Sequence, residues 1–526
     1  MRPASSFGQI FSSPWVLAFA VLLSFYWQLG AVPLYDLDEG AFTEATREML
    51  ASGNYITPHK DGEPRYDKPA LIYWLQAASV KVLGLNELAL RLPSALAATG
   101  WLIGLWWFVR ERLDAPTATV AALVMALTLQ VSVIAKAATA DAVLNLFLAL
   151  VFFDMYRHYL RPARGTLLRV YLWMGLGFLT KGPVAVFFPV LVSFLFYLSE
   201  RSLKDWLRAA FSPLGWVLFL VVAVPWYVAI YLDSGAGFFE SFFLRHNLGR
   251  FGDAMHGHKG FAGYYFVVLP LILLPFTGWF LRLLPAIRRG WADPLDRFLW
   301  LWFAAVFVVF SFSGTKLPHY LLYGATPLFI LMARHRELLA SRWLAYVPPV
   351  AFFLLLLLLP DVVDLLAEQA DRAHQVALFE EGRRVLDGGY RLAVAGGLVV
   401  LLILAFWRRF ALWQSLLLVG FVQTILVFGV LVPRVFEVMQ APVKEAALVA
   451  RGMDLPTVVY RTSMPSFSVY REAITPDRDP RPGELVFLRV DKLERLGERF
   501  PQLEQELVYR RGAVALVKMT AGQGDG

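Results

Sequence analysis

Long apolar runs recur from one end of this chain to the other, and they argue against a soluble globular fold. A helix that spans a bilayer needs about 20 mostly apolar residues. Of the 526 residues, 58% are hydrophobic and only 17% are charged, whereas a soluble domain has about 25% charged residues. The fold class predicted is a polytopic α-helical membrane protein. About thirteen transmembrane helices are expected, at 13–33, 91–110, 116–134, 141–160, 168–180, 182–200, 212–232, 261–283, 296–313, 317–334, 342–360, 391–407 and 410–432.

The distribution of Lys and Arg orients these spans. Basic residues gather in the short gaps after every second run, as at Arg157 and Arg161 or at Arg288 and Arg289. Cytoplasmic loops carry such an excess, so the N-terminus is predicted to be cytoplasmic. With an odd number of spans, the C-terminus is then periplasmic. The same pattern explains the net charge of +8, and no nucleic-acid partner is expected.

Two parts of the chain are predicted. Residues 1–433 form the transmembrane domain, and 34–90 is its first periplasmic segment. There, the helical spacing of apolar residues over 39–50 predicts an amphipathic helix on the membrane surface, and 70–83 predicts a second interfacial helix. Residues 434–526 are richer in charge, and they are predicted to form a small periplasmic α/β domain. Its expected strands lie at 458–460, 485–488 and 513–517, and its expected helices at 441–451 and 491–499.

Acidic residues at the outer ends of spans are the first candidates for chemistry. Asp38 and Glu39 follow the first span, and Asp141 lies at the outer end of the fourth. A carboxylate beside a span is costly to desolvate and is therefore often functional, as a base or as a ligand. The alternative is that such acids only end a span or cap the next helix.

Several cations also lie on the outer side, against the general charge bias. Lys68, Lys181 and Lys316 each stand near Gly or Pro, and Arg250 lies in the outer loop 233–260. Together they favour an anionic ligand such as a phosphate at headgroup depth, although single lysines can also snorkel to lipid phosphates. The same loop holds His246, a candidate metal ligand whose surroundings match no closed zinc site. The chain has no cysteine and no Walker, GxGxxG or GxSxG motif.

An ordered series of short motifs resembles a known family. The series closely resembles the bacterial aminoarabinose lipid A transferases and the wider glycosyltransferase family 39, which includes the protein O-mannosyltransferases. The resemblance covers residues 10–335, and one departure is Gly40-Ala41-Phe42, where those enzymes usually carry an arginine. The motifs are Asp38-Glu39, Glu44, Arg47 to Gly53, Asp67-Lys68-Pro69, Tyr73-Trp74-Leu75, Arg91 to Ala95, Thr139 to Ala142, Phe178 to Gly182, Pro225-Trp226, His246 to Phe251, and Lys316-Leu317-Pro318 with Tyr320.

The resemblance implies a GT-C fold and an inverting transfer of a sugar from a polyprenyl-phosphate donor. By position, Asp38 and Asp141 match essential carboxylates, and Glu39 joins them as a catalytic candidate. The implied donor-phosphate site contains Lys68, Lys181, Arg250, Lys316 and Tyr320. No cofactor is required by this pattern, and a divalent metal would be held by Asp67 and His246.

The predicted function is transfer to an acceptor on the periplasmic face of the bacterial inner membrane, with lipid A phosphate as the acceptor. Two alternatives stay open: transfer to another envelope glycan or to a protein hydroxyl, and transport of a lipid-linked sugar. The chain buries enough surface to fold alone, so a monomer among membrane lipids is expected.

Overall fold

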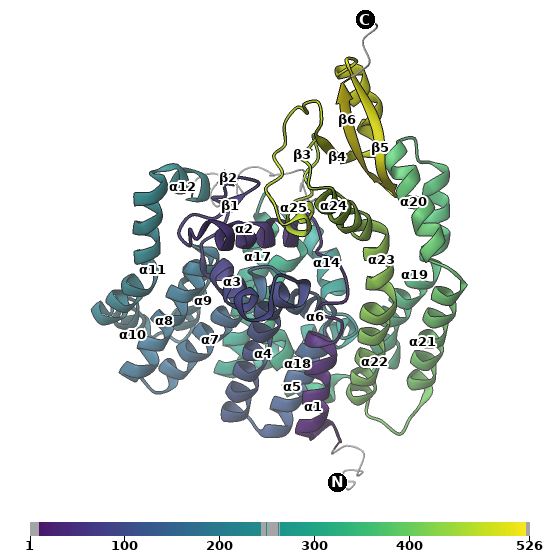
Figure 1. Cartoon of the computed structure of the whole chain (residues 1–526). Coiled ribbons are helices and arrows are strands. Elements are labelled where there is room, and N and C mark those ends of the chain that lie inside the picture. The colour runs from purple at the N-terminus through teal and green to yellow at the C-terminus, as the bar shows by residue number, and fades with distance from the viewer. Residues whose placement is uncertain (1–9, 244–248, 250–260, 262, 522–526) are drawn as a thin grey trace, which may run out of the picture.

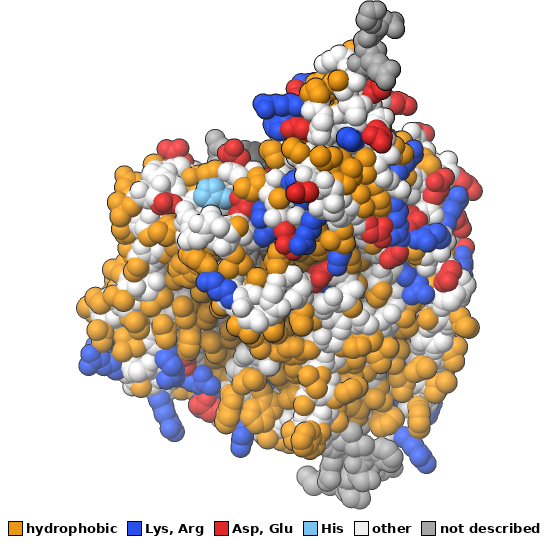
Figure 2. Space-filling model, viewed as in Figure 1, with side chains coloured by type: hydrophobic (Ala, Val, Ile, Leu, Met, Phe, Trp, Pro, Cys, Tyr) orange, Lys and Arg blue, Asp and Glu red, His pale blue; other side chains and the backbone are white. Residues whose placement is uncertain are grey.

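Apolar helices pack side by side in one helical body, and a small sheet stands on one end of it (Figure 1). The computed structural model describes residues 10–243, 249, 261 and 263–521. Hydrophobic side chains cover the middle of the face shown in Figure 2. Lys and Arg project from the end opposite the sheet, and both charges gather beneath the sheet. An apolar belt between two charged ends is the surface that a bilayer requires.

Among the described residues, seven helices are long and apolar enough to cross a membrane, or nine if each bent pair counts as one span. The bent pairs are α5 (Ala115–Leu127) with α6 (Leu129–Ala135), at 71°, and the helices over Tyr264–Ile272 and Thr277–Gly290, at 118°. The seven are α4 (Glu87–Arg112), α7 (Asp141–Leu160), α11 (Pro213–Ser234), α17 (Pro294–Phe312), α19 (Arg342–Glu368), α21 (Gly388–Phe406), and Leu412–Met439, which joins α22 (Leu412–Leu426), the π-helical turn η8 (Val427–Leu431) and α23 (Val432–Met439).

Shorter elements fill the rest of the helical body. The predicted span at 317–334 is a 3-10 helix, η6 (Pro318–Gly324), followed by the nine-residue α18 (Thr326–Arg334), which is too short to cross a bilayer. The number thirteen stays a prediction. The other elements are η1 (Ile10–Ser12), α1 (Pro14–Val21), the π-helical η2 (Leu22–Tyr26), α8 (Arg164–Lys181), α9 (Val184–Ser199), α10 (Leu203–Ala210), α12 (Gly237–Phe239), α14 (Tyr264–Ile272), α15 (Thr277–Leu283), η5 (Leu284–Ala286), α16 (Ile287–Gly290), η7 (Arg336–Leu338) and α20 (Ala373–Val385).

The helix at the centre of the body is α5. All of its residues from Thr117 to Leu127 are buried, and a helix that is apolar all round belongs in such a position. The chain bends directly after it, at Thr128, and α6 then leads to the start of α7. This bend brings residues 130–141 to one internal face, where the cavity described below lies.

The first outer segment contains both expected helices, α2 (Asp38–Ser52) and α3 (Leu71–Leu83), and a short hairpin of β1 (His59–Lys60) and β2 (Glu63–Pro64). That the first helix lies on the membrane surface stays a prediction, but the helix has no free polar face. Most residues of α2, including Glu44 and Glu48, are buried, because α3 and α25 (Ser466–Arg471) pack against it.

The C-terminal α/β unit, defined here as residues 441–521, contains a four-stranded sheet in the order β3-β4-β6-β5. β3 and β4 are parallel, and β6 is antiparallel to both β4 and β5. The three expected strands and two expected helices are confirmed, whereas α25 and β5 were not anticipated. The elements are α24 (Ala441–Met453), β3 (Thr457–Val459), α25, β4 (Leu485–Arg489), η9 (Val490–Lys492), α26 (Leu493–Arg499), β5 (Leu503–Arg511) and β6 (Val514–Ala521).

Candidate active site

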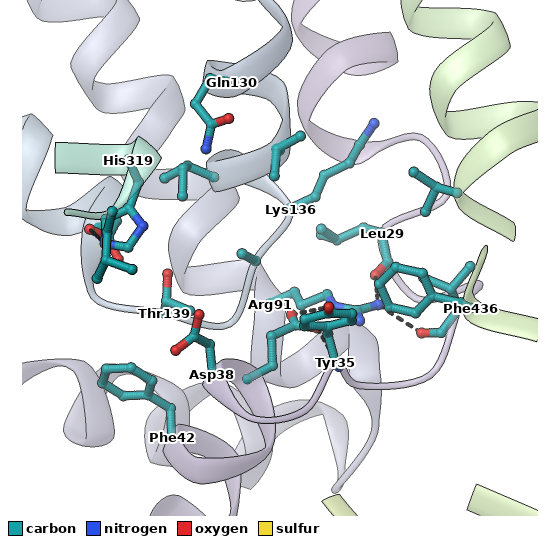
Figure 3. Close-up of a pocket in the computed structure, with 18 of the residues that line it drawn as sticks. Leu29, Tyr35, Asp38, Phe42, Arg91, Gln130, Lys136, Thr139, His319 and Phe436 are labelled. Carbon is teal, nitrogen blue, oxygen red and sulfur yellow. Dashed lines mark hydrogen bonds and ion pairs between the residues drawn. The ribbon is translucent and has the colours of Figure 1, made fainter. Parts of the chain in front are cut away.

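A cavity of about 450 Å³ lies where the first outer segment meets the α6–α7 connection, η6 and the η8–α23 region (Figure 3). It is concave and partly apolar, with a few converging polar groups, as small-molecule sites usually are. Seven of the sequence-predicted residues line this cavity: Asp38, Glu39, Asp67, Lys68, Asp141, Lys181 and Tyr320.

Asp38 is the first residue of α2, and its side chain lines the cavity. It makes no cap on its own helix, and no described residue donates a hydrogen bond to it. Figure 3 shows Asp38, Thr139 and Phe42 among the residues that line the cavity. A carboxylate that lines a cavity and has no hydrogen-bond partner among the described residues can accept a proton from a bound ligand.

Asp141, by contrast, is paired through one of its carboxylate oxygens. The Lys181 ammonium donates to Asp141 Oδ1 at 2.5 Å and to the Tyr323 hydroxyl at 2.8 Å. The Tyr323 hydroxyl donates to the same carboxylate oxygen at 3.2 Å, and His319 Nε2 lies 3.7 Å from it. The charges of Asp141 and Lys181 are thus paired at this end of the cavity.

The local sequence explains how this pair meets. Asp141 begins α7 and Lys181 ends α8, so an antiparallel helix pair brings both side chains to the outer end. Gly182 follows with φ of 74°, a left-handed conformation that glycine adopts without strain, and the chain turns into α9. A Cβ at Gly182 would lie 2.4 Å from the Phe242 ring, so this turn is closely packed.

Glu39 forms a buried brace beneath Asp38. Arg91 donates to both carboxylate oxygens of Glu39, at 2.8 and 2.7 Å. The same carboxylate accepts from the backbone N–H of Ala138 at 2.7 Å and of Tyr35 at 2.9 Å. Arg91 also donates to carbonyl groups in the 29–33 turn. A bidentate arginine–carboxylate pair fixes geometry strongly, so this brace ties α2 to α4 and to the start of α7.

The Asp67-Lys68 motif also reaches the cavity. The Lys68 ammonium donates to the carbonyl of Asp67 at 2.9 Å, and Arg65 Nε lies 3.3 Å from Asp67 Oδ2. The Arg65 guanidinium lies over the Phe42 ring, 4.8 Å from its centroid. Sequence analysis missed Arg65, although a third basic group two residues before the motif was a usable signal. This wall of the cavity therefore carries the cations Arg65 and Lys68 beside the carboxylate of Asp67.

Tyr320 and Lys316 lie differently with respect to the cavity. Tyr320 lines it, and its ring stacks on Phe310 with centroids 4.7 Å apart. The Lys316 ammonium instead donates to the carbonyls of Ser311 and Ser313, at 2.7 and 2.9 Å, and it is not among the residues that line the cavity. Its predicted contact with the donor phosphate stays a prediction.

Two predicted residues, His246 and Arg250, lie outside the described residues. Within the described part of the chain, no three His, Asp or Glu side chains are grouped closely enough to hold a metal ion. Asp67, which is paired with Arg65, supplies one carboxylate, and one carboxylate does not make a metal site. Divalent-metal binding stays a prediction that the described residues do not support.

Lys136 is the cavity residue that sequence analysis missed most clearly. It follows α6, is only 9% exposed, and lines the cavity. A lone lysine at the outer end of an apolar run was the available signal. Tyr323 was missed too, and its position one helical turn after His319 could have suggested it.

The C-terminal α/β unit contacts the segment that carries Asp38. Ser466 donates to Asp36 through its backbone N–H at 2.9 Å and through its hydroxyl at 2.5 Å. Burial raises the pKa of Asp36 to about 7, although the hydrogen bonds from Ser466 oppose this shift. Gly40 lies at the same contact, where a Cβ would come within 2.1 Å of Asp36 Oδ1. Thus α25 is packed directly onto the start of α2.

The sequence and the fold have counterparts in known proteins. A family model described as dolichyl-phosphate-mannose-protein mannosyltransferase matches residues 67–228. An undecaprenyl phosphate-alpha-4-amino-4-deoxy-L-arabinose arabinosyl transferase from Aeromonas salmonicida is 33% identical over 330 residues, which are 61% of this chain and 59% of that protein. An uncharacterized protein from Aquifex aeolicus is 30% identical over 62% of this chain and 73% of its own length. The chain belongs to glycosyltransferase family 39, within the GT-C membrane glycosyltransferases.

A solved structure shares this fold. The crystal structure of ArnT from Cupriavidus metallidurans bound to undecaprenyl phosphate matches this chain with a TM-score of 0.78 at 22% sequence identity. The match covers 99% of this chain and 100% of the ArnT chain. This likeness shows the GT-C fold. The chain matches less than two thirds of the length of the first curated relatives, 59% for Aeromonas salmonicida and 56% for Edwardsiella ictaluri. Membership of the family therefore leaves the substrates of this chain to be argued from its site.

Proposed function

We propose that the chain is an integral-membrane glycosyltransferase that moves a sugar from a polyprenyl-phosphate donor to a lipid A phosphate on the periplasmic face. The observation that carries the proposal is Asp38, a carboxylate with no hydrogen-bond or ion-pair partner among the described residues, in a cavity that also holds Lys68 and the Asp141–Lys181 pair. The names of the relatives, which specify an undecaprenyl phosphate-linked aminoarabinose, support this donor class and this sugar.

Lys68 is assigned to the donor phosphate. Lys181 forms an ion pair with Asp141 at 2.5 Å, whereas Lys68 and the neighbouring Arg65 are two further cations that line the cavity. As the sugar leaves, negative charge develops on the polyprenyl phosphate, and fixed cations stabilise it in a site that excludes water. Arg250, Lys316 and Tyr320 complete the predicted donor site.

The reaction breaks the bond between the anomeric carbon and the donor phosphate oxygen, and it forms a bond from the same carbon to an acceptor oxygen. The configuration inverts because the acceptor attacks from the opposite face. With a hydroxyl acceptor, Asp38 takes the proton that is released. A phosphate monoester is already largely ionised near neutral pH, since its second pKa is about 6, and Asp38 then positions the acceptor and the sugar.

Asp141 and Glu39 support this chemistry in different ways. Asp141 holds Lys181 and faces His319 and Tyr323, so it is placed to orient the sugar. Glu39, predicted as catalytic, is assigned a positioning role through Arg91, because both of its oxygens are engaged in the brace. That brace holds the first turn of α2, on which Asp38 stands.

The same proposal places the chain in the bacterial inner membrane as a monomer. We propose about thirteen spans. Lys and Arg gather at the end opposite the sheet (Figure 2), and this supports a cytoplasmic N-terminus and a periplasmic C-terminal α/β domain over 434–526. The cavity then faces the periplasm, where a phosphate at headgroup depth can reach Lys68.

Mass spectrometry of lipid A and of the envelope glycan and protein pools tests the proposal. Cells without the chain are compared with cells that express it or its Asp38→Asn variant. We expect an added mass of one aminopentose on lipid A phosphate that requires Asp38. A hexose on glycan or protein, with unchanged lipid A, would point to an O-mannosyltransferase-like activity. No change in any pool would contradict a transferase and favour a transporter of lipid-linked sugars.

A further inference from the structure

Lys136 stands at the opposite end of the cavity from Asp141 and Lys181. In Figure 3, His319 and Phe42 lie on one side of Thr139 and Asp38, whereas Lys136 lies on the other. Its ammonium donates to the carbonyl of Leu23 at 3.2 Å and lies 3.6 Å from the centroid of the Phe428 ring. Both partners belong to π-helical turns, η2 and η8, and such turns are frequent at functional sites.

The charge of Lys136 has no counter-charge in the described part of the chain. An ammonium has three donors, and only the one to Leu23 has an acceptor in the described structure. The side chain is 9% exposed, and no described carboxylate forms an ion pair with it. A buried charge is costly unless it is paired, and a ring contact compensates it only in part. An anionic group is therefore the ligand that this end of the cavity lacks.

The surroundings of Lys136 indicate what else such a ligand must carry. Leu29, Val32, Phe428, Val432 and Phe436 also line the cavity, and Figure 3 shows Leu29 and Phe436 on the same side as Lys136. One cation in a largely apolar wall suits an amphiphile with a single negative head, rather than a free sugar or a nucleotide. A phosphorylated lipid has this chemistry.

Asp38 separates the two positively charged ends. An inverting displacement requires the attacking oxygen and the leaving oxygen to lie on opposite faces of the anomeric carbon. In Figure 3, Lys136 and His319 lie on opposite sides of Asp38, and Lys68 interacts electrostatically with His319. With the donor phosphate at Lys68, the attacking group therefore arrives from the side of Lys136. The Thr139 hydroxyl, which is buried and has no hydrogen-bond partner in the described structure, belongs to a residue that lies between His319 and Lys136 in that view.

We propose that Lys136 is the phosphate-binding residue of the acceptor subsite, and that this subsite takes a phosphorylated acyl lipid between η2 and η8. The inference rests on the proposed function and adds to it the place of the acceptor. The donor end then binds one phosphate at Lys68, and the acceptor end binds a second at Lys136.

Binding measurements test this assignment independently of turnover. The full chain in nanodiscs is titrated with hexa-acylated lipid A 1,4′-bisphosphate, with its dephosphorylated analogue and with undecaprenyl phosphate. Lys136→Met should weaken binding of the bisphosphate about tenfold, the loss expected for one charge-assisted hydrogen bond, and should leave the other two Kd values unchanged. Lys136→Arg should retain binding, because the charge is kept.

The matched control is Lys81→Met. Lys81 is also a lysine over an aromatic ring, 4.8 Å from the centroid of Tyr55, but it is exposed and lies outside the cavity. Unchanged bisphosphate binding by Lys136→Met, or a loss confined to undecaprenyl phosphate, would overturn the assignment. If Lys136→Met does not fold, Lys136→Gln is judged by the same criteria.

Kinetics separates this inference from the proposed function. In a chain that transfers sugar, Lys136→Met should raise the KM for the phosphorylated acceptor about tenfold and leave the KM for the polyprenyl donor unchanged. An active variant with an unchanged acceptor KM contradicts the acceptor subsite alone. A wild-type chain that transfers no sugar contradicts the proposed function, and the binding measurements still decide where the lipid phosphate sits.

Discussion

Lys181 and Lys136 are the same residue type in the wall of the same cavity, but their surroundings differ. Lys181 is held 2.5 Å from Asp141 and 2.8 Å from the Tyr323 hydroxyl. Lys136 meets a carbonyl at 3.2 Å and an aromatic ring. A charge that the fold itself balances is part of the scaffold, whereas a buried charge that the fold leaves unbalanced is available to a ligand. The two lysines thus offer different electrostatic surroundings to a ligand.

Asp38 and Asp141 repeat this contrast with carboxylates, and their Asn variants should show the largest effects. Asp38→Asn should lower transfer by about 10²- to 10⁴-fold, the range of a lost general acid or base, without lowering the melting temperature. Asp141→Asn should also abolish transfer, but it leaves Lys181 buried without its main partner and should destabilise the fold by about 3 kcal/mol. Transfer of labelled sugar and thermal melting in detergent measure both effects.

Equal loss of stability in the two Asn variants would contradict this contrast. It would mean that Asp38 is held by the protein and is not left to the ligand. Wild-type transfer by Asp38→Asn would remove it from the mechanism altogether.

Removing each lysine compares the two ends directly. Lys181→Met leaves the buried Asp141 carboxylate without its main counter-charge and should lower the free energy of unfolding by about 3 kcal/mol. Lys136→Met removes a buried cation that has no counter-charge among the described residues, and it should leave stability unchanged or raise it by about 1 kcal/mol. Chemical denaturation of the two variants in the same detergent measures the difference. A large destabilisation by Lys136→Met would show that its charge is used by the fold.

Tyr323→Phe tests the end of the cavity that holds the Asp141–Lys181 pair. The substitution removes a hydroxyl that bridges Lys181 and Asp141 but leaves the ion pair, so stability should fall by about 1 kcal/mol. Transfer should fall about tenfold or less, because the carboxylate loses one of its three neighbours. Tyr346→Phe removes a buried hydroxyl that is bonded to Ser415, outside the cavity, and serves as the control for stability without an effect on transfer.

The smallest effect concerns pH and the contact between α2 and α25. Burial raises the pKa of Asp36 to about 7 and that of Glu44 to about 8. The folded state therefore binds these protons more tightly than the unfolded chain does, and the stability so gained is lost as the pH rises through 7 to 8. The melting temperature should be a few degrees lower at pH 8.5 than at pH 5.5.

Asp36→Asn should reduce this pH dependence, because it removes one of the two groups. Asp364→Asn, at an exposed ion pair with Arg383, should leave the pH dependence as it is. An identical slope in wild type and Asp36→Asn would contradict the assignment to Asp36.

Hydropathy alone was sufficient to predict the architecture of the long spans. It could not foresee the 71° bend after α5 or the division of 317–334 into η6 and α18, because packing against neighbours and prolines decides where an apolar run stays straight. The burial of α2 was not predictable either. Its polar residues favour a face toward water or headgroups, but α25, which lies near the other end of the chain, packs against α2.

The candidate site was predictable where its residues belong to short motifs. Asp38, Lys68, Asp141 and Lys181 were each found in this way, and all four line one cavity. The sequence could not predict which side chains these residues contact. Whether a lysine meets an acid or an aromatic ring depends on residues far along the chain, as Phe428 does for Lys136.

The contact between Ser466 and Asp36 also has a consequence for biosynthesis. The two residues are 430 positions apart, so a ribosome that has just finished the segment with Asp38 must work for about 20 to 90 s more, at 5 to 20 residues per second, before the serine exists. During that interval the first spans can already be inserted, but Asp36 lacks both of its donors. The nascent chain therefore carries Asp38 on a segment that Ser466 does not yet hold, and this contact can form only when synthesis is nearly complete.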